Sequence, residues 1–276
     1  MPFLPLLIVA CLTALLIAWL WWQPQITAWR RMRVQRAPFP DAWRDIIRRR
    51  VPYVRALPAD LQLQLKKHIQ VFLAEKAFIG CGGLVMTDEI RVTIAAQACL
   101  LILNRPTDYY PKLRQILVYP GAFFVDRVQT DFAGIQREQR QVLSGESWTQ
   151  GQVILSLHDT VEGAAVVDDA QNVVIHEFAH QLDSEKGYTN GAPLLIGRQR
   201  YERWSRVMSQ AFAQLQRDAA QGLPTLLNPY GATNPAEFFA VLSETFFEQP
   251  GELAAQHPDL YRELCDFYRI DPLSWS

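Results

Sequence analysis

The sequence has few cysteines, few histidines and no excess of basic residues. Its cysteines stand singly at Cys11, Cys81, Cys99 and Cys265, without a Cys-x-x-Cys pair. This pattern indicates neither a disulfide framework nor a cysteine-rich zinc site, and it is typical of buried thiols in a reducing compartment. The formal net charge of −1 lacks the basic footprint that direct binding of nucleic acid requires.

Charge is missing altogether from one long stretch at the amino terminus. Phe3 to Trp22 are 20 residues without a charged side chain, about the length that an α-helix needs to cross the hydrocarbon core of a bilayer. Tryptophans gather at the end of the stretch, as they do at membrane interfaces. A cleaved signal peptide would have a basic start, a shorter apolar core and a small-residue cleavage site. The sequence therefore predicts a transmembrane anchor over residues 1–23.

Arginines follow this stretch, whereas only the terminal amine precedes it. They are Arg30, Arg31, Arg33, Arg36, Arg44, Arg48, Arg49 and Arg50. The positive-inside rule then predicts a single-pass inner-membrane protein whose remaining chain lies in the cytoplasm. Residues 24–58 read as a basic juxtamembrane connector with a short helix near residues 41–50. Its arginines either contact anionic lipid headgroups or serve only to fix the topology.

Residues 59–276 have the patterns of a folded α+β domain. Helical spacing of apolar residues predicts helices over residues 59–78, 88–103, 198–222 and 260–268, and another that begins at Pro235. The pair Pro120-Gly121 predicts a hairpin between strands at residues 116–119 and 123–125. Residues 153–157 read as a further strand, either central in a sheet or an edge that binds an extended substrate. We expect a mainly helical domain with a small mixed sheet.

One apolar, helix-compatible run contains the residues His176-Glu177-Phe178-Ala179-His180. Histidines four residues apart lie on the same face of a helix, so both imidazoles can reach one metal ion. Glu177 follows the first histidine, where its carboxylate can take a proton from the water that attacks a carbonyl. The apolar neighbours indicate a buried helix, in which such polar groups need partners. The run therefore predicts a zinc peptidase site.

Catalytic zinc usually has three protein ligands, so the two histidines need one more donor. The candidates are His257, Asp183, Glu185, Glu202, Glu237 and Glu244. Asp183 and Glu185 follow the histidines too closely to reach the open side of the metal, and Asp183 fits better at the helix end or beside a ligand. Glu237 and Glu244 lie two turns apart on one helical face. Because Asn234-x-x-Glu237 also has the spacing of a capping box, the third ligand stays open.

Four blocks of sequence occur together along the predicted domain. They are Gln97-Ala98-Cys99-Leu100-Leu101, Gly145-Glu146-Ser147-Trp148, His176-Glu177-Phe178-Ala179-His180-Gln181-Leu182-Asp183 and Asn234-Pro235-Ala236-Glu237-Phe238-Phe239-Ala240. The combination resembles the Mlc titration factor A family of zinc-dependent peptidases, whose metal site is similar to that of the anthrax lethal factor catalytic domain. The resemblance implies a zincin-like domain with zinc on His176, His180 and Glu237. It also implies Glu177 as general base and Tyr230 as hydrogen-bond donor to the developing oxyanion.

The same resemblance implies a zinc metallopeptidase that hydrolyses peptide bonds, with an aminopeptidase-like action on small peptides. The family's namesake binds the glucose repressor Mlc and relieves repression of the sugar phosphotransferase system. A repressor of the Mlc type is therefore an expected partner beside a peptide or protein substrate. The alternative is a non-catalytic protein that sequesters such a repressor. The intact Glu177 favours the enzyme, because a scaffold has no use for a general base.

Overall fold

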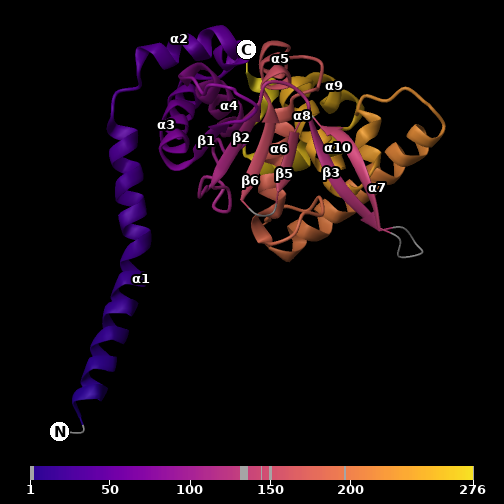
Figure 1. Cartoon of the computed structure of the whole chain (residues 1–276). Helices are drawn as coiled ribbons and strands as arrows, with labels where there is room; N and C mark the ends of the chain where they lie inside the picture. The colour runs from indigo at the N-terminus through magenta and orange to yellow at the C-terminus, as the bar shows by residue number, and fades with distance from the viewer. Residues whose placement is uncertain (1–2, 131–135, 144, 149–150, 196, 276) are drawn as a thin grey trace. The chain divides into compact units, whose positions relative to one another are not determined.

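The protein is described by a computed structural model (Figure 1), which covers residues 3–130, 136–143, 145–148, 151–195 and 197–275. The chain divides into two compact units, Met1–Phe39 and Pro40–Ser276. The first unit is one long helix with its short continuation. The second contains the sheet, the remaining helices and every candidate site residue named above.

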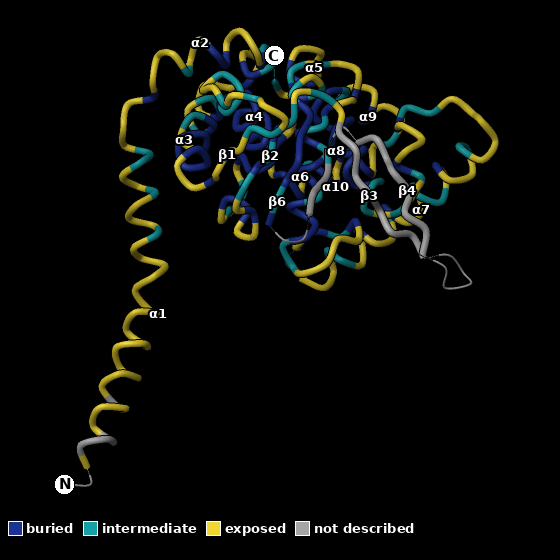
Figure 2. Tube along the Cα trace, in the orientation of Figure 1, coloured by how far each residue is buried: buried dark blue, intermediate teal, exposed yellow. Residues whose placement is uncertain are grey.

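A single helix, α1 (Leu4–Arg36), makes up most of the first unit. It does not end after the apolar stretch but continues through Pro24 to Arg36, inside residues 24–58, the predicted basic juxtamembrane connector. Proline removes one helical hydrogen bond, yet good helix formers follow it and the helix goes on. By length and composition α1 can cross a membrane, a criterion that an amino-terminal signal sequence also meets. Most of its described residues are exposed (Figure 2).

The second unit is mainly helical, as the sequence predicts. Its α-helices are α2 (Asp41–Arg50), α3 (Ala59–Glu75), α4 (Asp88–Leu100), α5 (Leu157–Ala165), α6 (Val173–Asp183), α7 (Arg198–Ala220), α8 (Pro235–Glu248), α9 (Pro250–Gln256) and α10 (Pro258–Tyr268). Short 3₁₀ turns lie at η1 (Pro52–Ala56), η2 (Ser184–Lys186), η3 (Pro229–Ala232) and η4 (Pro272–Ser274). The predicted helix over residues 59–78 ends early, because the chain after Glu75 enters a strand.

A small mixed sheet lies among these helices, in the order β1-β2-β6-β5. The strands β1 (Ala77–Gly80), β2 (Gln115–Tyr119) and β6 (Gln152–Ser156) are parallel, and β5 (Gly145–Trp148) runs antiparallel to β6 at the edge. The mixed sheet is confirmed, but the hairpin at Pro120-Gly121 is wrong. Both sides of β2 are occupied by β1 and β6, so β3 (Phe123–Thr130) pairs instead with β4 (Gln136–Leu143) in a separate ribbon.

The position of β6 decides between the two roles left open for residues 153–157, since the strand is central in the sheet. This strand has β2 on one side and β5 on the other, so its backbone is paired on both sides and cannot receive an extended substrate. The edge strand nearest the predicted site is β5. After β6 the chain forms α5 and then α6, the helix that carries the two histidines. The antiparallel edge strand β5 contacts α6.

The helix α6 is the centre of the packed unit. Its Phe178 is fully buried and contacts Phe72 of α3 and Tyr110, with ring centroids 5.7 Å and 4.9 Å away. On its other side α6 packs against α8, whose residues from Phe238 to Glu248 are all buried. A helix buried on both sides has a fixed position, which any site built on it requires.

Asn172 fixes the start of α6. Its Oδ1 accepts a hydrogen bond from the backbone N–H of Ile175 at 3.0 Å, which caps the helix. Its Nδ2 lies 2.9 Å from each of three acceptors, Gln97 of α4, the carbonyl of Gly163 in α5 and Glu248 of α8, which share its two N–H groups. One buried amide thus joins the beginning of α6 to three other helices, and its loss would remove a hydrogen bond from each of these buried partners.

We expect Asn172→Ala to lower the free energy of unfolding by about 3 kcal/mol, the sum of a lost cap and of buried groups left without partners. Asn234→Ala is the matched control, because Asn234 caps α8 through the N–H groups of Ala236 and Glu237 and should cost only about 1 kcal/mol. Urea unfolding of the full-length variants measures both values. Equal losses would show that Asn172 acts as a cap and nothing more.

Candidate metal centre

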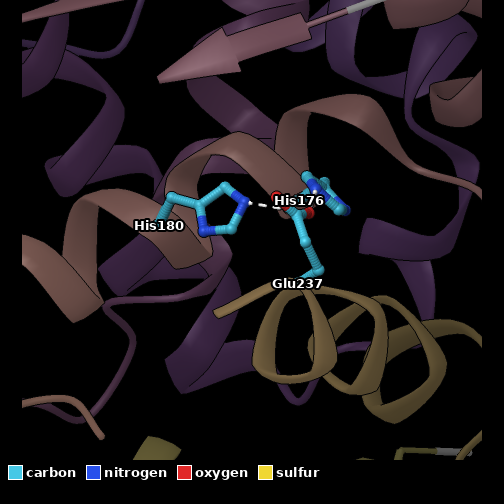
Figure 3. Close-up of side chains that lie close together, drawn as sticks. All are labelled: His176, His180 and Glu237. Atoms are coloured by element: carbon cyan, nitrogen blue, oxygen red, sulfur yellow. Dashed lines mark hydrogen bonds and ion pairs between the residues drawn. The ribbon is translucent and has the colours of Figure 1, made fainter. Parts of the chain in front are cut away.

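The two histidines of α6 lie one turn apart on the face that looks toward α8. Their ring centroids are 4.9 Å apart, and both side chains are largely buried, with 14% and 12% of their surface exposed for His176 and His180. Figure 3 shows the imidazoles and the carboxylate of Glu237 turned toward one another. The spacing that predicted a shared face is therefore realised in the structure.

Glu237 enters this group from the first turn of α8. Asn234 caps the helix through its own side chain, which leaves the carboxylate of Glu237 facing α6. Its Oε2 lies 3.0 Å from Nε2 of His176 and 3.4 Å from Nε2 of His180. The three side chains offer ligand atoms within 4.8 Å of one another and could hold a metal ion. The geometry therefore favours the role of metal ligand for Glu237 over that of a capping-box residue.

Glu244, the competing candidate, contacts the other nitrogen of the same imidazole. Its Oε1 lies 2.8 Å from Nδ1 of His176, and its Oε2 accepts a hydrogen bond from the backbone N–H of Asn172 at 2.6 Å. A carboxylate at Nδ1 favours a proton on that nitrogen, so Nε2, which faces Glu237 and His180, is the nitrogen that could bind a metal ion after losing its own proton. Glu244 therefore orients His176 instead of joining the three converging donors.

Two carboxylates facing one imidazole favour positive charge at this point. Burial by itself would lower the pKa of His176, but hydrogen bonds to Glu237 and Glu244 raise that pKa well above its usual value. Burial likewise would raise the pKa of Glu237, whereas hydrogen bonds from His176 and His180 bring it well below the usual range. Opposite shifts on the partners indicate a strongly coupled cluster. A divalent cation would supply the positive charge that these carboxylates favour.

The second histidine lacks the support that the first one has. In the described part of the chain, the buried Nδ1 of His180 has no hydrogen-bond partner. The two imidazoles are therefore held unequally, His176 by a carboxylate on each nitrogen and His180 on its Nε2 alone. The position of His180 depends more on the packing of α6 than on polar contacts.

Glu177 lies beneath the edge strand, with only 5% of its surface exposed. A Cβ atom on Gly145 of β5 would be 2.6 Å from Oε1 of Glu177 and 2.6 Å from Cγ2 of Val173. Only glycine allows the strand to come this close to the helix. No local sequence signal predicts this role of Gly145, because the contact joins segments that are separate in the chain.

A cleft of about 470 Å³ opens beside these groups. It is lined by Gly145, Asp159, Glu162, Gly163, Asp169, Gln171, Asn172, Val173, His176, Glu177, Asn228, Tyr230, Val241 and Glu244. Among the described lining residues there are carboxylates but no lysine or arginine, which gives this part of the cleft a negative potential. Tyr230, on the turn η3, is 52% exposed and its ring centroid lies 6.1 Å from that of His176.

The remaining candidates lie outside the group of three donors. Asp183 ends α6, and its Oδ2 accepts a hydrogen bond from the N–H of Gly191, so it secures the following loop. Glu202 pairs with Arg198 on the exposed side of α7. His257 precedes α10, and burial lowers its pKa. His158 forms an exposed group with Asp159 and Glu162 on α5, at the outer end of the cleft.

A His-Glu-x-x-His helix that meets a glutamate from a second helix is typical of metallopeptidases. Comparison with known proteins agrees with this class. Residues 26–269 match the family described as glucose-regulated metallo-peptidase M90. The chain belongs to this family. The match begins after the apolar part of α1, so the shared family region is the remainder of the chain.

Curated relatives extend over most or nearly all of the chain. A protein of Synechocystis sp. (strain ATCC 27184 / PCC 6803 / Kazusa), described as uncharacterized, is 41% identical over 271 residues, 98% of each chain. Proteins named Mlc titration factor A are 33% identical in Salmonella typhi, over 93% of each chain, and 34% identical in Klebsiella pneumoniae subsp. pneumoniae, over 81% of this chain and 84% of the relative. The predicted resemblance to the Mlc titration factor A family is confirmed.

We expect Glu244→Gln to weaken zinc binding by about 10- to 100-fold, the usual effect of removing a carboxylate that orients a metal-binding histidine. The glutamine retains the shape but cannot hold the proton on Nδ1 of His176 as strongly. Zinc affinity is measured by competition with a chromophoric chelator on the full-length protein. This readout does not depend on turnover.

Glu248→Gln provides the matched control. Glu248 lies one turn further along α8, is as deeply buried as Glu244 (8% and 7% exposed) and bonds to Asn172 without contacting His176. Burial, and then the charges of Glu244 and Asp169, raise the pKa of Glu248 to about 8. It is therefore mainly neutral at pH 7, and glutamine should change zinc affinity little. Equal weakening in both variants would contradict the specific role of Glu244.

Proposed function

We propose that this metallopeptidase-family chain has a zincin-like domain and is an active zinc-dependent peptidase that hydrolyses peptide bonds. The observation that supports it is the convergence of His176, His180 and Glu237, together with a cleft that His176 and Glu177 line. Two imidazole nitrogens and one carboxylate form a donor set that catalytic zinc uses. The residues present thus fit the metal.

The proposed chemistry divides among a few side chains. Zinc held by His176, His180 and Glu237 would act as a Lewis acid that polarises the scissile carbonyl and acidifies water. Glu177 takes the proton of the attacking water and passes it to the leaving amine. Tyr230 donates a hydrogen bond to the oxyanion as charge develops on it. Its exposed position on η3 beside His176 allows it to meet a bound substrate.

The edge strand β5 supports the binding of an extended substrate. Within the described residues β5 pairs with β6 alone, so its other edge offers backbone groups to a peptide. Gly145 holds this strand against Glu177. A peptide paired with β5 would therefore pass close to the proposed general base.

An aminopeptidase-like action fits the charge of the cleft. Its described lining includes Asp159, Glu162 and Asp169 and no lysine or arginine. Carboxylates that line the same cleft as His176 favour a protonated amine, such as the terminal ammonium group of a short peptide. The substrate class that we propose is accordingly a small peptide with a free amino terminus.

A second candidate function is the binding of a transcriptional repressor. It is favoured by the name of two relatives, Mlc titration factor A, and it requires no catalysis. A repressor of the Mlc type is the partner that this name suggests. The two functions differ in whether Glu177 is needed, so a Glu177→Gln variant distinguishes them.

We further propose that α1 anchors the protein in the inner membrane with the peptidase domain in the cytoplasm. The support is an apolar helix of sufficient length followed by arginines, with none before it, the charge distribution that keeps a flank in the cytoplasm. The relative from Synechocystis aligns over 98% of the chain, which extends this comparison into α1.

Glu177→Gln keeps the shape of the side chain but cannot accept a proton. We expect zinc content and thermal stability near those of the wild type, while peptide hydrolysis falls by about 100-fold or more, the usual contribution of a general base. Turnover of aminoacyl and peptide reporters, together with metal analysis, measures both quantities. Tyr230→Phe should lower kcat more than it raises KM, because an oxyanion donor acts in the transition state.

The control for this experiment is His180→Ala, which should lose both zinc and turnover. A zinc-loaded wild type that cleaves none of the reporters, or a Glu177→Gln variant as active as the wild type, would contradict the peptidase. Binding to a repressor that persists in Glu177→Gln would then favour the second candidate.

Membrane fractionation tests the anchor. Full-length protein should sediment with membranes and resist extraction by high salt, whereas a chain starting near Pro38 should not. A reporter fused to the carboxyl terminus should be active only if it functions in the cytoplasm. A mature protein that begins near Gln25, or a periplasmic reporter signal, would show that the helix is a cleaved leader.

A further inference from the structure

A second hollow lies in the Pro40–Ser276 unit, between α2, η1 and α3, and it shares no residue with the cleft of the metal centre. Its volume is about 370 Å³. Four cations line it, and none of its lining residues is acidic. The cations are Arg44, Arg48, Arg55 and Lys66. We propose that this hollow binds the headgroup and the adjoining acyl chain of an anionic phospholipid.

The floor of the hollow is apolar. It consists of Ile47, Val51, Val54 and Leu65, none of which is more than 7% exposed. A free phosphate ion would bind the cations but would not cover the apolar floor. A neutral lipid would contact the floor but would bring no net negative charge to the four cations at the rim. An anionic lipid satisfies both parts at once.

The cations at the rim are available to such a headgroup. Arg44 pairs with Asp41 and Arg48 with Asp45, but 49% and 66% of these arginine side chains are exposed. Exposed pairs of this kind contribute little and exchange readily. Arg55 is held in place by a hydrogen bond from its guanidinium to the carbonyl of Arg48. A guanidinium fixed in this way can bind phosphate through its remaining N–H groups.

The order of the chain favours a membrane lipid over an acidic peptide. The helix α2, which supplies two of the four cations, begins at Asp41, and α1 ends at Arg36, so only four residues separate them. If α1 is an anchor, as proposed above, anionic lipids are abundant near this part of the chain. The inference rests on that proposed location but not on the peptidase activity.

Native mass spectrometry of the full-length protein in neutral detergent tests the binding directly. We expect one dioleoyl phosphatidylglycerol per chain to be retained, and phosphatidylcholine to be retained much more weakly. The double variant Arg48→Gln, Lys66→Gln should bind about 25-fold more weakly, since each cation near an anionic lipid contributes about fivefold. The measurement in detergent is independent of whether α1 crosses a membrane in the cell.

The double variant Arg49→Gln, Lys67→Gln is the matched control. It removes the same charge from neighbouring positions of α2 and α3, at exposed residues that do not line the hollow, and it should bind within about twofold of the wild type. Equal losses in both double variants would overturn the proposal in favour of a diffuse basic surface. Displacement of the lipid by inorganic phosphate or by an acidic peptide as effectively as by excess phosphatidylglycerol would overturn it as well.

Discussion

The contact of two α8 carboxylates with one imidazole of α6 is the constraint on which the site depends. Glu237 and Glu244 lie on opposite nitrogens of His176, and all three side chains are largely withdrawn from water. Buried charges are tolerated only with partners, so α6 and α8 must keep one register. Asn172 secures that register, because its backbone N–H binds Glu244 and its side chain binds Glu248. The cap of α6 and the proposed ligand set are therefore parts of one polar network.

The candidate site could be predicted from the sequence where the signal is local. The spacing of His176 and His180 on one helix places them on one face, and the structure agrees. The choice between Glu237 and Glu244 was beyond any local pattern, because it depends on which turn of α8 lies opposite which turn of α6. The contact of Gly145 with Glu177 was missed for the same reason. Its backbone conformation needs no glycine, and only the approach of a separate helix excludes a Cβ atom.

In the fold, most of the longer helices were predicted, whereas the short helices α5 and α9 and the strand pairings were not. Helical periodicity and caps such as Thr87 and Asn234 act within a few residues, whereas a strand is defined by its neighbours. The chain does bend at Pro120-Gly121, but β2 already has a strand on each side, so the chain leaves the sheet there. The four residues of β1 follow α3 without any pattern that separates them from the helix. In α1, Pro24 does not end the helix, because the residues on both sides of it remain helical.

The sequence separation of these contacts governs when the site can exist during synthesis. Glu237 and Glu244 reach His176 across 61 and 68 residues, with the whole of α7 between them. Contacts over such distances form late, after the local helices. A chain that is still emerging from the ribosome at α7 already contains both histidines and Glu177, yet it has neither carboxylate of α8. The three converging donors come together only when the carboxyl-terminal helices dock, so the ability to hold the metal is a property of the finished molecule.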